Sequence, residues 1–365
     1  MISRHKASSG LVGVDIGSSS VKVVELKEKR GRYELVNLAL NNLAHEAILN
    51  GAIVDAVSLA STVRKTFEEN KISTSNVATS LAGECVVVKR ATVTAGSEEE
   101  LDHAIRQEAM QNVQLDMANA NLSYYVLGAL QEKDSLDWRA DRYRGARQLE
   151  VLLLAVQNDR LQSHTELFIH ANRTPVVVDV DAFALQNAFE LSYEPPPEQM
   201  IALLNVGASM MNINITRGGM PLFTRDVSVG GKHYTSILQR ELGLTLEEAE
   251  KLKMGIEVSK VHSVAELPHL MSVSQSLLSE VQGAFYEFHQ TTPEPIQAIY
   301  LAGGSARVRG LADLLQAELK APVEIIDPFR KIYCNPAKFD KEFVATLAPR
   351  MTVAVGLALR SFDAA

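Results

Sequence analysis

The chain has 365 residues, of which 46% are hydrophobic and 22% are charged. These proportions exclude a disordered chain, and the length predicts two or three subdomains rather than one small core. The net charge of −8 argues against a general nucleic-acid-binding protein, because such proteins neutralise phosphates with a basic surface.

The cysteines and the apolar segments bear on where the protein works. Cys85 and Cys334 are far apart and lack the spacing of metal ligands, which favours a reducing compartment. We therefore expect a cytoplasmic protein without a structural metal. No apolar segment typical of a signal peptide precedes the first predicted strand. Residues 151–156 and 353–359 are too short to span a bilayer, so we expect membrane association only through a partner.

Residues 11–25 predict a strand, a polar turn and a second strand. Apolar residues precede Asp15, and alternating valines around Lys22 restart the strand. Backbone N–H groups of such a turn can hold phosphate, with Lys22 near the oxygens and Asp15 near a metal ion. An ordinary hairpin with a serine-rich turn fits the same residues. The turn between the strands consists of Gly17, Ser18, Ser19 and Ser20.

The chain from residue 33 to residue 193 predicts alternating strands and helices. Ser97 and Glu100 have the spacing of a capping box at the start of one helix. Residues 131–148 are polar and predict an exposed loop that contains Trp138, the single tryptophan. The predicted strands are 33–40, 76–81, 86–93, 122–126, 149–157 and 175–180, and the predicted helices are 55–67, 97–112, 159–170 and 182–193.

Three prolines within residues 194–198 predict a boundary, because proline neither continues a helix nor donates to a sheet. A second set of elements follows this link. It comprises predicted strands at 200–206, 210–216, 221–229, 295–301 and 323–325, and predicted helices at 232–242, 246–254, 269–289, 309–319 and 353–360.

The opening of the second half repeats the opening of the first. Residues 11–26 and 201–216 both read as strand, turn and strand, with Asp15-Ile16-Gly17 matched by Asn205-Val206-Gly207. A third glycine-rich turn at residues 303–305 follows a buried strand and precedes a helix. Two duplicated hairpins with this third turn predict a nucleotide held in a cleft between two domains.

These segments resemble the actin-like ATPase superfamily, which includes actin, Hsp70-type chaperones, sugar kinases and the division protein FtsA. The resemblance implies an α/β fold with duplicated βββαβα cores, an interdomain nucleotide cleft and an FtsA-type 1C subdomain. The implied parts are a tail at 1–9, subdomain 1A at 10–91 and 172–194, subdomain 1C at 92–171, a proline-rich link at 195–198, a second domain (2A and 2B) at 199–350, and a C-terminal segment at 351–365 whose helix packs on 1A.

Within the superfamily, the chain resembles the PilM family of type IV pilus assembly. The similar segments are residues 13–25, 178–185, 230–231, 300–305 and 356–363. The resemblance implies a cytoplasmic ATP-binding scaffold that docks the N-terminal tail of the inner-membrane protein PilN between subdomains 1A and 1C. It implies indirect links to PilO and to the platform and motor proteins, and contact with the membrane only through these partners. It implies that no nucleic acid is bound, and it is compatible with a homo-oligomer.

The resemblance also implies the residues of an ATP and Mg²⁺ site. Asp15 would hold Mg²⁺ through water, and Asp181 would position the attacking water. Glu250 and Lys253 would contact the ribose and the adenine. The remaining nucleotide-binding residues implied are Gly17, Ser18, Ser19, Ser20, Lys22, Asn205, Gly207, Ala208, Ser209, Gly231, Gly303, Gly304 and Ser305.

Two functions of different classes remain open, a nucleotide-gated scaffold and an ATPase with turnover. Asn205 stands where the second phosphate loop normally has Asp, and His233 stands where many relatives have Asp. Loss of a carboxylate weakens the hold on Mg²⁺ and its waters, which favours binding with slow or absent hydrolysis. Asp181 keeps turnover open. An FtsA-like division protein that forms filaments is a third alternative, disfavoured because no basic amphipathic helix ends this sequence.

Overall fold

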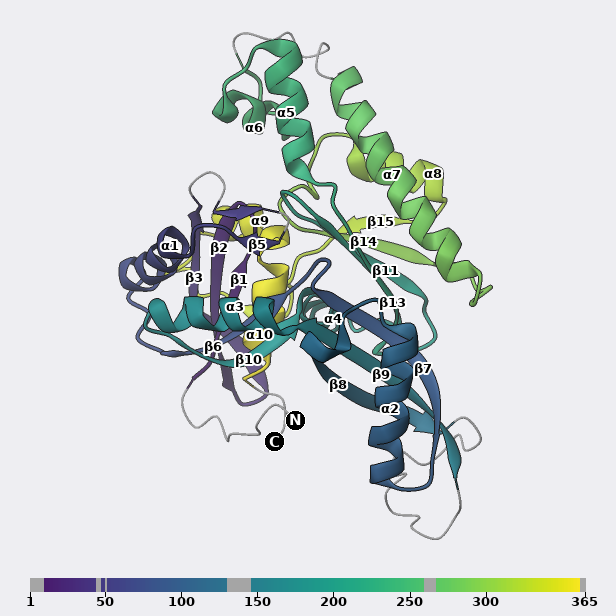
Figure 1. Cartoon of the computed structure of the whole chain (residues 1–365). Coiled ribbons are helices and arrows are strands. Elements are labelled where there is room, and N and C mark those ends of the chain that lie inside the picture. The colour runs from purple at the N-terminus through teal and green to yellow at the C-terminus, as the bar shows by residue number, and fades with distance from the viewer. Residues whose placement is uncertain (1–9, 44–46, 50, 130–145, 259–266, 362–365) are drawn as a thin grey trace. The chain divides into compact units, whose positions relative to one another are not determined.

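The computed structural model describes residues 10–43, 47–49, 51–129, 146–258 and 267–361. The chain divides into two compact units (Figure 1). The smaller unit comprises residues 84–165, and the larger comprises residues 4–83 together with 166–365. The predicted loop with Trp138 lies outside the described residues, apart from its last three positions.

The larger unit contains a six-stranded sheet in the order β10-β6-β1-β2-β3-β16. Strands β1, β2 and β3 are antiparallel neighbours, as the opening hairpin predicted, whereas β6 pairs with β1 in parallel. The strands are β1 (Val12–Ile16), β2 (Ser20–Lys29), β3 (Arg32–Asn42), β6 (Asn76–Leu81), β10 (Thr174–Val180) and β16 (Ile332–Tyr333), and a separate short hairpin consists of β4 (Ile48–Leu49) and β5 (Ala52–Ile53).

A second sheet in the larger unit has five strands in the order β13-β12-β11-β14-β15. Its first three strands are antiparallel and β14 runs parallel to β11, so this sheet repeats the pairing of the first one. The duplication predicted from the sequence is therefore confirmed. The strands are β11 (Ile201–Val206), β12 (Met211–Arg217), β13 (Met220–Val227), β14 (Ala298–Ala302) and β15 (Val323–Ile325).

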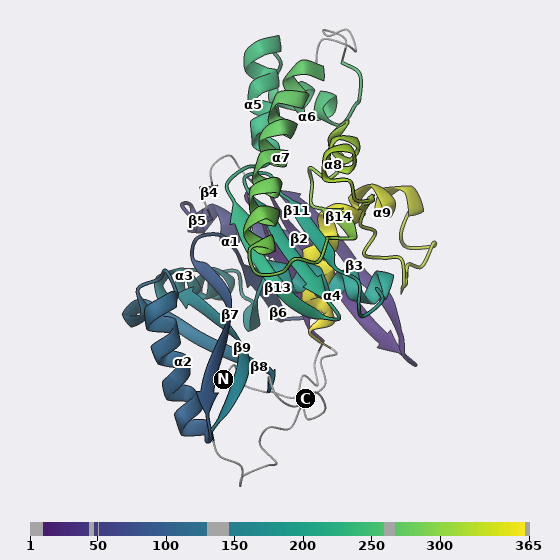
Figure 2. The same ribbon diagram turned by 90° about the vertical axis from the view of Figure 1, so that its right-hand side faces the viewer.

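Helices cover both sheets of the larger unit. One face of the six-stranded sheet packs on α1 and α3, and α4 and α10 pack between the two sheets. The far face of the five-stranded sheet packs on α5, α7 and α8, which Figure 2 shows grouped with α6. The helices are α1 (Ala56–Glu69), α3 (Asn158–His170), α4 (Asp181–Tyr193), α5 (Gly231–Leu242), α6 (Leu246–Lys253), α7 (Leu267–His289), α8 (Leu311–Leu319), α9 (Lys341–Leu347) and α10 (Thr352–Leu359).

Helix α10 lies against β1 at unusually short range (Figure 1). A Cβ atom on Gly13 would lie 2.2 Å from the carbonyl oxygen of Ala354 and 2.5 Å from the amide nitrogen of Ala358. Glycine at this position therefore allows the strand and the helix backbones to touch. Sequence analysis missed α9, which precedes α10 through the 3₁₀ turn η2 (Ala348–Met351). Together these segments, Lys341–Leu359, pass the length and hydropathy criteria for a membrane span, and 72% of the apolar window is buried inside the protein.

The smaller unit has its own three-stranded antiparallel sheet in the order β7-β9-β8. Leu101 and Ile105 of α2 pack on one face of this sheet. Strand β7 pairs with β9 here, whereas the sequence prediction placed residues up to 91 in the first subdomain. The elements of this unit are β7 (Val86–Ala95), α2 (Glu98–Asn112), η1 (Met117–Asn119), β8 (Ala120–Ala129), β9 (Arg147–Gln157) and the first part of α3.

Candidate functional site

The first polar turn places Lys22 directly on Asp15. The two residues are partners in the β1–β2 ladder, and Lys22 Nζ lies 2.9 Å from Asp15 Oδ2. Both side chains are largely buried. The backbone N–H of Gly17 donates to Ser20 O at 3.1 Å and closes the turn that contains Ser18 and Ser19. A Cβ atom on residue 17 would lie 2.9 Å from Lys22 Nζ, so glycine leaves the space that the ammonium occupies.

Ser20 differs from the other serines of this turn because its side chain is fully buried. Its hydroxyl oxygen has no hydrogen-bond partner among the described residues. A buried polar atom without a partner is uncommon in folded proteins, and it lies here at the end of the predicted phosphate turn.

Asp181, at the first position of α4, lies close to the first turn. The Ser80 hydroxyl donates to its carboxylate, with Oγ 2.6 Å from Oδ1. Burial raises the pKa of Asp181 to about 7, and the negative charges of Asp15 and Asp226 act in the same direction. Asp179, two residues earlier, instead forms an ion pair with Arg360 at 2.7 Å. The two aspartates therefore have separate partners, and only Asp181 belongs with Asp15.

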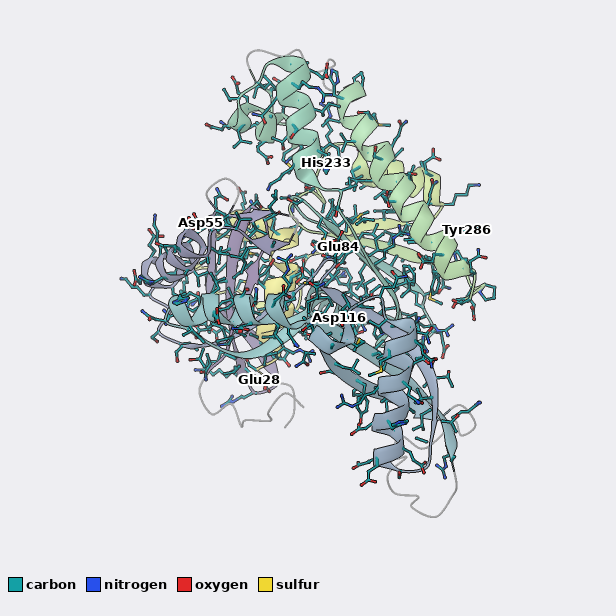
Figure 3. The ribbon with its side chains drawn as sticks, in the orientation of Figure 1. Glu28, Asp55, Glu84, Asp116, His233 and Tyr286 are labelled. Carbon is teal, nitrogen blue, oxygen red and sulfur yellow. The ribbon has the colours of Figure 1, made fainter. Side chains whose placement is uncertain are left out.

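The second polar turn, between β11 and β12, is closed by the N–H of Gly207, which donates to Met210 O at 2.8 Å. Ala208 and Ser209 form the turn. The backbone N–H groups of Gly231 and Lys232 donate to the carbonyl oxygens of Gly207 and Ala208 at 2.9 and 2.7 Å. The second turn is therefore fastened to the start of α5. In Figure 3, His233 lies at the end of α5 next to the strands, where its Nδ1 is 3.3 Å from Gly230 N.

Glycines bring the segment 303–305 against the second turn. A Cβ atom on Gly303 would lie 2.4 Å from Val206 O and 2.7 Å from Asn205 Oδ1. The Ser305 hydroxyl donates to Gly207 O at 3.2 Å, and a Cβ atom on Gly231 would lie 2.2 Å from that hydroxyl oxygen. Three glycine-containing segments that are distant in the sequence thus meet at one place, because only residues without side chains allow this approach.

Lys253 and Glu250 lie on α6 beside this meeting point. Lys253 Nζ is 2.6 Å from Glu250 Oε1 and also donates to Thr235 Oγ1 at 3.1 Å and Gly231 O at 3.4 Å. Burial lowers the pKa of Lys253, and the Glu250 carboxylate opposes this shift. Lys253 is buried whereas Glu250 is half exposed. The pair therefore presents its carboxylate toward solvent and its ammonium toward the glycine segments.

Sequence analysis missed three polar residues at this place, namely Ser80, Asp226 and Arg350. Asp226 accepts hydrogen bonds from Asn212 Nδ2 at 2.7 Å and from the backbone N–H of Gly83. Arg350 lies against Gly304, with Nε 3.7 Å from the position of a Cβ atom there. An arginine inside the apolar segment 341–359 was a usable sequence signal, because charged residues are rarely buried unless they have a partner. No local signal marked Ser80 or Asp226.

The predicted site residues therefore form two groups, and both groups lie within the larger unit. One group surrounds Asp15, Lys22 and Asp181, and the other surrounds Gly207, Gly231, Lys253 and Ser305. Asn205 lies beside the second group, because its Oδ1 is 2.7 Å from the position of a Cβ atom on Gly303, and its Nδ2 donates to Asn212 at 2.8 Å. Within the described ranges, no three His, Cys, Asp or Glu side chains are arranged to hold a metal ion directly.

Comparison with known proteins identifies the fold and a family. A family model described as type IV pilus assembly protein PilM matches residues 13–362. A solved structure described as a PilM-PilN type IV pilus biogenesis complex is 25% identical, with a TM-score of 0.82, and the match covers 98% of this chain and 99% of that chain.

Two further solved structures share the fold at lower identity. The ethanolamine utilization protein EutJ from Carboxydothermus hydrogenoformans is 15% identical, with a TM-score of 0.56 and coverage of 95% of this chain and 88% of that chain. MreB5 of Spiroplasma citri bound to AMPPNP is 12% identical, with a TM-score of 0.52 and coverage of 98% and 96%. The fold is therefore the actin-like fold that the sequence predicted.

Proposed function

Because this chain belongs to the PilM family of type IV pilus assembly proteins, we propose that it is an ATP-binding scaffold that docks the cytoplasmic N-terminal tail of PilN. The observation that carries the nucleotide part is the Asp15–Lys22 pair at a turn whose glycine leaves room for the lysine ammonium. The solved PilM-PilN complex and the AMPPNP-bound MreB5 support the partner and the nucleotide.

The proposed site assigns each group of residues a part of ATP. Backbone N–H groups of Ser18 and Ser19, with Lys22, would hold the phosphates from one side. The turn at residues 207–209 would hold them from the other side. Mg²⁺ prefers oxygen ligands and keeps several waters, which suits Asp15 acting through water in a site without three direct ligands. Glu250, Lys253 and the segment 303–305 would contact the nucleoside.

We propose that hydrolysis is slow or absent. Asp181 has a pKa of about 7, which is near the value that suits a general base at neutral pH, so this residue favours the alternative and the case for slow hydrolysis rests on position 205. Asn205, at the second polar turn, supplies no carboxylate to the site, and a missing carboxylate weakens the hold on Mg²⁺ and its waters. The alternative is an ATPase with turnover through Asp181. Steady Mg²⁺-dependent phosphate release that Asp181→Ala abolishes would establish the alternative.

Peptide docking is proposed for the smaller unit. Side chains alternate along a strand, so Leu152, Leu154 and Val156 of β9 lie on the sheet face opposite the one that packs on α2. Apolar positions on a sheet can accept alternate side chains of an extended peptide. This face supports the proposed 1C-type role of the unit in PilN binding.

The proposed place in the cell follows from PilN. We propose that the chain is cytoplasmic and reaches the inner membrane through PilN, with PilO and the platform and motor proteins as indirect partners. Homo-oligomerisation is compatible with this role.

The deciding experiment is a calorimetric titration of the full chain with the PilN tail peptide, with and without ATP and Mg²⁺. Saturable binding of the peptide and of ATP supports the proposal. A scrambled peptide of the same composition is the control. Absence of PilN peptide binding under both conditions would refute the scaffold role, and absence of ATP binding would refute the nucleotide role.

A further inference from the structure

Three polar side chains form a row across the five-stranded sheet of the larger unit. Asn205 of β11 is the direct ladder partner of Asn212 of β12, and Asn212 is the direct ladder partner of Asp226 of β13. Asn205 Nδ2 donates to Asn212 Oδ1 at 2.8 Å, and Asn212 Nδ2 donates to Asp226 Oδ1 at 2.7 Å. The register of the sheet therefore creates a continuous hydrogen-bonded chain of side chains, which we call the amide relay.

The carboxylate at one end determines the direction of the amide relay. An ionised carboxylate only accepts hydrogen bonds, whereas an amide side chain can present either its oxygen or its NH₂ group. Burial raises the pKa of the Asp226 carboxyl, but both of its oxygens accept N–H donors, one from Asn212 Nδ2 and the other from the backbone of Gly83, which is the pattern of the ionised form. Asn212 must therefore turn its NH₂ toward Asp226 and its oxygen toward Asn205.

The same logic orients Asn205 at the other end. Since Asn212 offers an oxygen, Asn205 turns its NH₂ toward Asn212 and its own Oδ1 away. That Oδ1 faces the Gly303 backbone at the meeting point of the glycine segments and accepts no hydrogen bond from any residue the structure describes. The second NH₂ hydrogen of Asn212 has a weak acceptor in the sulfur of Met210, at 3.7 Å from Nδ2.

We infer that Asp226 is a positioning residue that makes Asn205 present a carbonyl oxygen, rather than an amide NH₂, to the nucleotide site. This inference rests on the proposed function of that site. An oxygen can accept a hydrogen bond from water bound to Mg²⁺, as one oxygen of an aspartate would, whereas an NH₂ group cannot. Asp226 thus compensates in part for the missing carboxylate at position 205.

The amide relay can be reversed without changing the net charge. In Asp226→Asn, the carboxylate that fixes the direction is lost, and Asn205 is free to flip. In the double variant Asn205→Asp with Asp226→Asn, every hydrogen bond can form in the opposite direction, and an oxygen again faces the site. Asn205→Asp alone places carboxylates on both sides of the Asn212 amide, so one of them faces the Asn212 oxygen instead of its NH₂ group.

The test measures ATP affinity with and without Mg²⁺ for these variants by calorimetry. Asp226→Asn should lower the affinity in the presence of Mg²⁺ about tenfold, with a smaller change in its absence. The double variant should recover most of this loss. Thr224→Val, a change of similar volume two residue pairs along the same ladder, where Thr224 pairs with Asn214, is the matched control and should behave as the wild type.

Two results would overturn the inference. One is an unchanged ratio of affinities with and without Mg²⁺ in Asp226→Asn, and the other is a double variant that binds no better than this single variant. If the wild type binds no ATP, the proposed function fails, and urea unfolding then tests the amide relay by itself. The relay requires the double variant to unfold at a higher urea concentration than either single variant, and a lower or equal midpoint refutes it.

Discussion

The carbonyl oxygen of Ala184 lies 1.7 Å from the place that a Cβ atom on Gly356 would occupy. Gly356 belongs to α10 and Ala184 to α4, the two helices that pack between the sheets of the larger unit. Any side chain at position 356 would therefore push the two backbones apart. Because this contact is with backbone rather than with the end of a flexible side chain, it cannot be relieved by a change of rotamer.

We expect Gly356→Ala to lower the free energy of unfolding by at least about 3 kcal/mol, because α4 and α10 must separate. Gly283 of α7 is the matched control, since a Cβ atom there would meet nothing closer than Arg225 Nη1 at 4.0 Å. Gly283→Ala should raise the free energy of unfolding by about 0.5–1 kcal/mol, the usual gain of alanine over glycine in a helix. Urea unfolding of both variants measures the difference, and equal effects would contradict the close packing.

We expect the first turn to contribute more to ATP binding than the second. Asp15→Ala and Lys22→Ala should abolish measurable binding, because each removes one partner of a largely buried ion pair. Asn205→Ala should reduce the affinity about tenfold, the effect of one neutral hydrogen bond. Titration with ATP and Mg²⁺ measures all three, with circular dichroism to verify folding. Equal losses in the three variants would contradict this ranking.

Asp181 should make the protein less stable as the pH rises. Its pKa is about 7 in the folded protein and about 4 when unfolded, so the folded state binds the extra proton between these values. The resulting stabilisation is complete below about pH 4 and is lost as the pH rises through 7, and one pKa unit corresponds to about 1.4 kcal/mol. Asp181→Asn should remove this loss between pH 5 and pH 8. Asp313→Asn, at an exposed position of α8, is the control, and an unchanged pH profile in Asp181→Asn would contradict the prediction.

His164 should make the protein less stable as the pH falls. Burial lowers the pKa of this imidazole from 6.5 to about 4, so the unfolded state binds the proton first as the pH falls. The stability is complete above pH 6.5 and declines by about 2 kcal/mol by pH 5. His164→Gln should unfold with less dependence on acid, as thermal melts at pH 7 and pH 5 would measure. His103→Gln, at an exposed position of α2 in the same unit, should leave the wild-type dependence in place.

Local patterns predicted the turns of the candidate site well, because a turn depends on residues that are adjacent in the chain. Gly17 and Gly207 close the two hairpins as expected, and Asp15 and Lys22 meet because a hairpin pairs residues on its two strands. Ser80 and Asp226 could not be found in this way. Their roles arise from contacts with Asp181 and Asn212, which depend on how strands and helices pair across the fold.

The sequence by itself determined the duplicated strand–turn–strand units and the position of each glycine turn, since hydrophobic period and turn chemistry are local properties, and the actin-like fold followed from the resemblance of these segments to a known superfamily. Only the tertiary structure decided which polar groups share a neighbourhood. It separated Asp179, paired with Arg360, from Asp181 beside Ser80, although these aspartates are two residues apart. It also placed Asn205, Asn212 and Asp226 in one row, because strand register joins residues that no sequence spacing connects.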